Sequence, residues 1–169
     1  MTAPTLSGPL PRTLALVDVS RARTQVLEDA YVAEIDAVYA AALASWKSSP
    51  RPEPSDGSDD GSALLTAALL AALVAILRRA HAAGVAEGVA FARQQVESVG
   101  GTPPLPVPPE SFLDLLVADF IRGQAESSVA TGLVSSRAQV LRLADGLRSR
   151  ARLAAVVAVH AGRSAAVLA

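Results

Sequence analysis

A cluster of arginine side chains near the C-terminus has the residue type and spacing that could bind a charged partner. Five of them follow one another within a short stretch: Arg142, Arg148, Arg150, Arg152 and Arg163. Residues 133–169 hold six basic and one acidic side chain, a net charge of +5, whereas residues 1–132 hold nine basic and fifteen acidic side chains, a net charge of −6. Clustered guanidinium groups contact phosphates, so we expect this basic tail to meet DNA or an acidic partner. A solvated face is the alternative, because Asp145 can pair with neighbouring arginines.

Catalytic and metal-binding patterns are sparse in this sequence. The chain has no cysteine and two histidines, His81 and His160, which stand far apart. Disulfides, thiolate zinc sites and thiol nucleophiles are therefore excluded. The sequence holds no H-E-x-x-H, no G-x-S-x-G and no Walker loop. We predict a non-enzymatic protein with no catalytic residue, metal or cofactor, in which His81 lies at a helix interface.

The composition indicates how these residues are positioned. The chain has 169 residues, of which 51% are hydrophobic, 4% aromatic and 18% charged, and the apolar residues are mostly Ala, Leu and Val. Such a composition favours long helices that pack closely through small side chains. We expect an all-α fold of four to five long helices, in a bundle-like or extended arrangement with a proline-rich break. A mean hydropathy of +0.36 predicts that a partner covers part of the surface.

Residues 1–47 are expected to form the N-terminal long helix, from about Leu14. One arc of its helical wheel is apolar, and we predict that this arc is a helix–helix interface. Its main residues are Leu27, Tyr31, Ile35 and Val38. At about 50 Å the helix exceeds what a compact domain of this size needs, so we expect part of it to pack on another chain. Residues 48–61 contain no apolar side chain and are expected to be a flexible acidic linker.

Residues 62–99 are expected to form a central hydrophobic helix that begins at Ser62. The uncharged run 63–77 is about 22 Å long as a helix, too short for a bilayer, so a buried core helix is predicted and membrane contact is the alternative. Small residues then recur every four positions, which predicts close approach of another helix. These residues are Ala80, Gly84, Gly88 and Ala92.

Residues 100–109 contain five prolines, which predict a stiff proline-rich spacer. Residues 110–169 are expected to form a C-terminal helical section with the basic tail. We expect its first helix to end near Gly132 and a capped helix to follow from Ser136. A break near Asp145-Gly146 and a final helix from about Ser149 complete this prediction.

The C-terminal quarter carries a family resemblance. Gly132, Leu133 and Ser135 stand at a helix start, and Arg150-Ala151-Arg152 leads into Val156-Val157-Ala158. This arrangement resembles the helical part of the phage head morphogenesis family, the minor head proteins similar to the Mu F protein. That family continues with a Thr-Glu pair, which this chain lacks. The resemblance implies a protein of the phage head that contacts portal or capsid protein and packaged DNA.

We therefore predict a non-enzymatic structural protein, a minor head component that assists assembly of a phage-like particle and forms oligomeric contacts. Its location would be the virion, or otherwise the cytoplasm, because the N-terminal sequence shows no secretory signal pattern. A helical adaptor or oligomeric bundle unrelated to phage is one alternative. A membrane-interacting helical protein is another, although the short apolar run argues against membrane contact.

Overall fold

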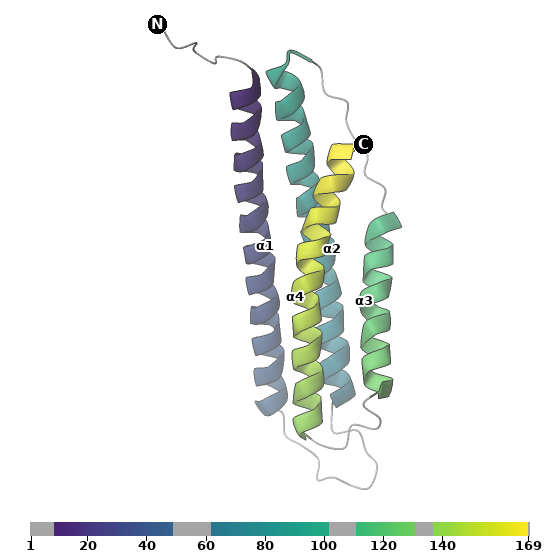
Figure 1. Cartoon of the computed structure of the whole chain (residues 1–169). Helices are drawn as coiled ribbons and strands as arrows, with labels where there is room; N and C mark the ends of the chain where they lie inside the picture. Colours follow the sequence, from purple (N-terminus) through teal and green to yellow (C-terminus); the bar gives the residue numbers. More distant parts are fainter. Residues whose placement is uncertain (1–8, 49–61, 102–110, 131–136, 169) are drawn as a thin grey trace, which may run out of the picture.

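A computed structural model describes residues 9–48, 62–101, 111–130 and 137–168 of the chain. They form four helices, which pack lengthwise as Figure 1 shows, and the all-α fold is confirmed for them. The helices are α1 (Pro9–Ser48), α2 (Ser62–Ser98), α3 (Ser111–Ala130) and α4 (Arg137–Leu168). Ser62 begins α2, as the sequence predicted.

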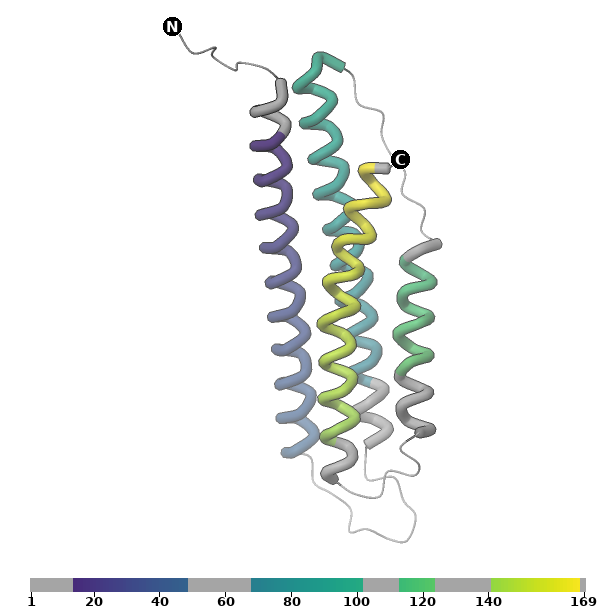
Figure 2. Tube along the Cα trace, in the orientation of Figure 1, coloured from purple at the N-terminus to yellow at the C-terminus, as the bar shows by residue number. Residues whose placement is uncertain are grey.

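Helices α2 and α4 form the centre of the bundle. They run in the same direction and share the most extensive contact, whereas α1 and α3 run the opposite way (Figure 2). Helix α1 packs on both central helices, and α3 packs on both as well. No contact joins α1 to α3 in the described part of the chain. The bundle is therefore a parallel central pair with one antiparallel helix on each side.

Glycines allow the backbones of α2 and α4 to touch. A Cβ atom at Gly84 would lie 2.1 Å from the carbonyl oxygen of Val159, and one at Gly162 would lie 2.3 Å from the carbonyl oxygen of His81. Gly88 meets the backbone of Arg163 in the same way. Any larger side chain would overlap these atoms, so the absence of a Cβ at the three glycines permits the contact.

The main core lies on the N-terminal side of these glycines in α2 and α4, where the two central helices meet α1 and α3. Its aliphatic residues come from all three longer helices, and Phe120 of α3 closes it on the far side. The fully enclosed members include Ile35, Leu73, Leu77, Leu147 and Ala155. Burial of such side chains contributes about 1.5–3 kcal/mol each, which is why long apolar helices come together here.

The C-terminus of α2 ends in a Schellman motif. Gly100 adopts a φ of +77°, its amide donates to the carbonyl of Glu97, and the amide of Gly101 donates to the carbonyl of Val96. A left-handed residue costs little when it is glycine, and the two bonds satisfy carbonyls that the helix leaves open. The first two glycines of the predicted spacer therefore stop α2.

Two expectations for the helices are wrong. No break occurs at Asp145-Gly146, because α4 continues from Arg137 to Leu168. Leu147 and Ala151 are fully buried, and their packing outweighs the cost of about 1 kcal/mol for a glycine inside a helix. The first helix also begins earlier than Leu14, at Pro9, because proline is tolerated in a first helical turn.

Several expectations fall on residues outside those described. They are the acidic linker after Ser48, most of the proline-rich spacer, the helix end near Gly132 and the capping residue Ser136. The described residues contain four helices, the lower of the two numbers predicted.

Alanine substitutions at glycines should show whether the close contact between the α2 and α4 backbones, rather than helix propensity, determines the effect on stability. Gly84→Ala and Gly162→Ala force the α2 and α4 backbones apart, and each should lower the free energy of unfolding by about 1–3 kcal/mol. Gly146→Ala is the matched control, because no atom lies within 4 Å of its added Cβ. It should raise the free energy of unfolding by up to about 1 kcal/mol. Urea titration followed by circular dichroism measures all three, and equal effects would contradict the close backbone contact.

Candidate functional site

The five predicted tail arginines do not form one surface. Arg148 and Arg152 reach α1, Arg150 reaches α3, and Arg163 lies between α1 and α2. Arg142 is exposed to solvent. The spacing of these side chains turns them around the axis of α4, so successive guanidinium groups meet different helices. Four of the five arginines that were predicted to contact DNA or an acidic partner thus have partners within the chain.

Asp36 of α1 is the main partner of these arginines. Arg148 donates from Nε to Oδ1 of Asp36 at 2.8 Å, and Nε of Arg152 lies 3.8 Å from the same oxygen. The hydrogen bond from Arg148 holds the pKa of Asp36 below its usual value. The Arg148 guanidinium also lies over the ring of Tyr39, 5.1 Å from its centre. These contacts tie the middle of α4 to α1.

Arg150 and Arg163 serve other junctions. Arg150 donates to the backbone carbonyl of Gly123 and so links α4 to α3. Arg163 donates to the Ser20 hydroxyl and stacks over the ring of Phe91 at 5.1 Å. Guanidinium groups that combine hydrogen bonds with stacking are well suited to such partly buried positions.

The predicted helix-face residues of α1 pack inside the chain. Ile35 is fully buried, and Val38 and Tyr31 lie against the main core. Leu27 and Tyr31 also cover a smaller cluster around Ala80 and Val159, and the Tyr31 hydroxyl donates to the carbonyl of Arg79 at 3.1 Å. We expected part of this helix to pack on another chain, but its apolar face is covered by α2 and α4 of the same chain.

The predicted small-residue stripe of α2 meets α4 of the same chain. Ala80 is fully buried, Gly84 and Gly88 are buried against the α4 backbone, and Ala92 is half-buried. The sequence pattern did not point to the matching residues of α4. They recur every four positions, as those of α2 do: Ala158, Gly162 and Ala166.

The two histidines lie in different environments. His81 is 5% exposed, its Nε2 has no hydrogen-bond partner in the described part of the chain, and burial lowers its pKa. His160 is exposed and contacts Glu28 of α1. Among the described residues, no three of His, Asp and Glu come together in a way that could hold a metal ion.

An apolar groove lies between α1 and α2. It has a volume of about 470 Å³. Its lining residues are Val19, Ala22, Arg23, Val26, Leu27 and Glu87. Oε1 of Glu87 is buried and has no hydrogen-bond partner among the described residues. An apolar groove with one unpaired carboxylate oxygen can accept an apolar segment that brings a hydrogen-bond donor.

The groove continues into a line of small apolar residues along the outside of α1, which we call the outer stripe. All of its members are exposed, and they recur at spacings of three and four. They are Ala15, Val19, Ala22, Val26, Ala30, Ala33, Ala37, Ala40 and Ala44. Val26 is 67% exposed. An alternating three-and-four spacing of apolar residues is the pattern that one helix presents to another.

One helix among the described residues is long and apolar enough to cross a membrane. It is the stretch Ala68–Ser98 of α2, with a mean hydropathy of 1.6. Length and composition alone do not distinguish such a helix from the core helix of a bundle. In this fold its Leu69, Leu73 and Leu77 are buried in the main core.

Replacement of single arginines should show which of them support the fold. Arg148→Ala removes the hydrogen bond to Asp36 and the contact with Tyr39, so it should lower the midpoint of thermal unfolding. Arg142→Ala is the matched control on the same helix, and it should leave the midpoint unchanged because its side chain is exposed. Differential scanning calorimetry compares them, and an equal response would contradict the structural role of Arg148.

Burial of His81 should make the fold sensitive to mild acid. Its pKa is lowered in the folded state from an ordinary value of 6.5, so the unfolded chain binds the proton first. Stability should be complete above pH 6.5 and should fall as the pH drops below 6.5. His81→Leu should flatten this decline in urea titrations, whereas His160→Gln should retain it. An unchanged decline in His81→Leu would show that another group titrates.

Comparisons of the chain with family models, with curated proteins and with solved structures found no match.

Proposed function

We propose that the protein is a non-enzymatic assembly component that binds a helix of another protein subunit in the groove between α1 and α2. The observation that carries this proposal is the combination of exposed Val19 and Val26 with the unpaired Oε1 of Glu87 in one groove. Exposed apolar residues arranged in one line indicate a contact surface more strongly than scattered ones do.

The length of the outer stripe supports a helix as the partner. From Ala15 to Ala44 it extends over about 44 Å, and its alanines allow the backbone of a second helix to come close. Loops and globular surfaces match such a straight, narrow line poorly. An amphipathic helix presents apolar side chains at the same three-and-four spacing.

Charge in and beside the groove defines the chemistry of that helix. A lysine or arginine of the partner would satisfy the buried oxygen of Glu87, since a charged donor offsets the cost of leaving a carboxylate unpaired. Asp18 and Asp29 are exposed on the other edge of the outer stripe, and together with Glu87 they outnumber Arg23, the one basic residue that lines the groove. The partner helix is therefore apolar on one face and basic at its border.

The narrower form of this proposal is a minor head protein of a phage-like particle, in which the partner helix belongs to portal or capsid protein. The resemblance of the C-terminal quarter supports this setting. Four of the tail arginines have partners inside the chain, which leaves fewer of them for DNA. This favours contact with protein over contact with DNA as the main role of this chain. An adaptor unrelated to phage would use the same groove with a different partner.

Synthetic helical peptides test the groove directly. A peptide with a Leu and Ala stripe bordered by lysines should bind the protein in isothermal titration calorimetry, and the same peptide with glutamates in place of lysines should not. Val26→Asp should weaken binding of the lysine peptide by about tenfold or more, because it places a charge on the apolar contact. Glu87→Gln should also weaken it, because the charged acceptor is lost.

Leu115→Asp is the matched control, because Leu115 is 68% exposed on α3, away from the groove. It should bind the lysine peptide like the original protein. Equal binding by Val26→Asp would contradict docking in the groove.

Co-expression with portal and capsid proteins, followed by light scattering, tests the narrower form of the proposal. A complex that Val26→Asp abolishes supports it, and a separate monodisperse species contradicts it. Co-sedimentation with liposomes would instead support the membrane alternative.

A further inference from the structure

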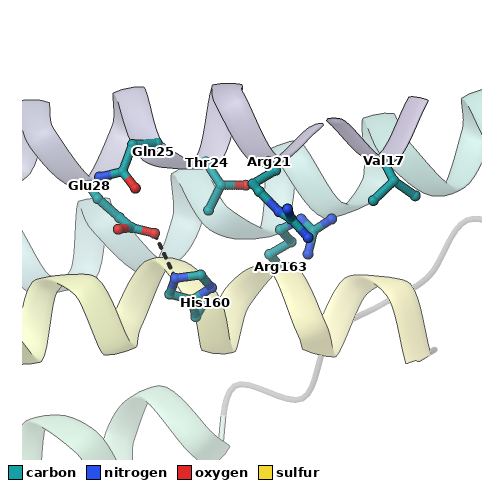
Figure 3. A pocket seen from close by; sticks show the side chains of 7 residues that line it. All are labelled: Val17, Arg21, Thr24, Gln25, Glu28, His160 and Arg163. Atoms are coloured by element: carbon teal, nitrogen blue, oxygen red, sulfur yellow. Dashed lines mark ion pairs between the residues drawn. The ribbon is translucent and has the colours of Figure 1, made fainter. Parts of the chain in front are cut away.

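A second cavity, on the other side of α1, lies between α1 and α4. It has a volume of about 320 Å³ and is lined mainly by polar side chains. They come from two helices that are far apart in the sequence (Figure 3). The lining residues are Val17, Arg21, Thr24, Gln25, Glu28, His160 and Arg163. The proposed docking groove does not include any of them.

Arg163 is held firmly at one end of this cavity. Its Nε and Nη2 atoms donate to Oγ of Ser20 at 3.2 and 3.0 Å, and Ser20 is 2% exposed. The ring of Phe91 supports the guanidinium plane at 5.1 Å. A guanidinium has five N–H donors, so this side chain keeps donors that are not used by Ser20. No carboxylate of the described residues forms an ion pair with it.

Arg21 brings a second guanidinium to the same place. Its side chain is exposed and makes no hydrogen bond or ion pair within the described part of the chain. Figure 3 shows the side chains of Arg21, from α1, and Arg163, from α4, in the space between the two helices. Both guanidinium groups are positively charged and line one cavity, so an anion bound between them would be attracted by both.

The remaining polar side chains of the cavity are already engaged. Thr24 donates to the carbonyl of Ser20 at 2.8 Å, and Gln25 donates to Asp29 at 3.0 Å. Glu28, 12% exposed, contacts Nε2 of His160 at 2.6 Å. Apart from the second amide N–H of Gln25, the donors that remain belong mainly to the two arginines.

We propose that Arg21 and Arg163 form a binding site for an oxyanion of the phosphate class, either free phosphate, a small phosphomonoester or a phosphate group of DNA. Guanidinium groups match phosphate oxygens in pairs, and Arg163 is preorganised because Ser20 and Phe91 fix its plane. The cavity is large enough for the phosphate together with a small attached group. This site is independent of helix docking in the groove.

Titration of the full chain with inorganic phosphate at constant ionic strength tests the site. Phosphate should raise the midpoint of thermal unfolding more than chloride does, and calorimetry should give a saturable isotherm. Arg21→Ala should weaken binding by about tenfold or more, the loss of a charged hydrogen bond. Glu28→Gln should strengthen binding, because it removes the one negative charge among the lining residues. Arg78→Ala, on the exposed side of α2, is the matched control and should bind phosphate normally.

Competition between phosphate and DNA shows which phosphate-bearing ligand the site binds. If a short duplex DNA displaces phosphate and Arg21→Ala weakens both, the site binds phosphate groups of DNA. If phosphate or glycerol phosphate binds and DNA does not compete, the site binds a small ligand. Because Arg21 is exposed, Arg21→Ala should fold normally, and circular dichroism checks this. Absence of phosphate and DNA binding, or binding that Arg21→Ala leaves unchanged, would overturn the proposal.

Discussion

Direct backbone contact between α2 and α4 is the constraint from which the rest of the bundle follows. In a regular four-helix bundle, side chains fill the centre and keep diagonal helices apart. Here Gly84, Gly88 and Gly162 remove those side chains, and the diagonal pair closes. Helices α1 and α3 then lie on opposite sides without touching in the described part of the chain, so each rests on the central pair. Helix α1 buries one face in this way and leaves its outer stripe open.

Most of the charged side chains that could take part in chemistry instead link the helices of the bundle. Asp36 receives Arg148 and Arg152, Glu34 pairs with Arg79 at 2.5 Å, and Arg150 reaches the backbone of α3. Exposed ion pairs of this type contribute little to stability individually, and each of these joins two different helices. Arg21 and Arg163 differ, because they converge on a cavity and their charges are not met by an acid among the described residues.

Much of the fold can be read from the sequence, because helical periodicity reports which residues share a face. The apolar arc through Ile35 and the small-residue stripe through Gly84 both carried that signal. Periodicity does not report which helix covers a face, so the partner of the stripe and the destinations of Arg148, Arg150 and Arg163 required the structure. The helix break at Gly146 was predicted wrongly because a local glycine preference was weighed without the burial of Leu147. The groove and the cavity each combine distant segments, and sequence spacing could not bring these together.

The parallel course of α2 and α4 has an electrostatic consequence. Each helix carries a macrodipole equal to about half an elementary charge at either end, so the two central helices place like partial charges side by side at both ends of the molecule. Helices α1 and α3 run in the opposite direction and bring partial charges of the other sign to those ends. The flanking helices therefore neutralise the central pair as well as cover it. An isolated α2–α4 pair would carry aligned dipoles with nothing to compensate them.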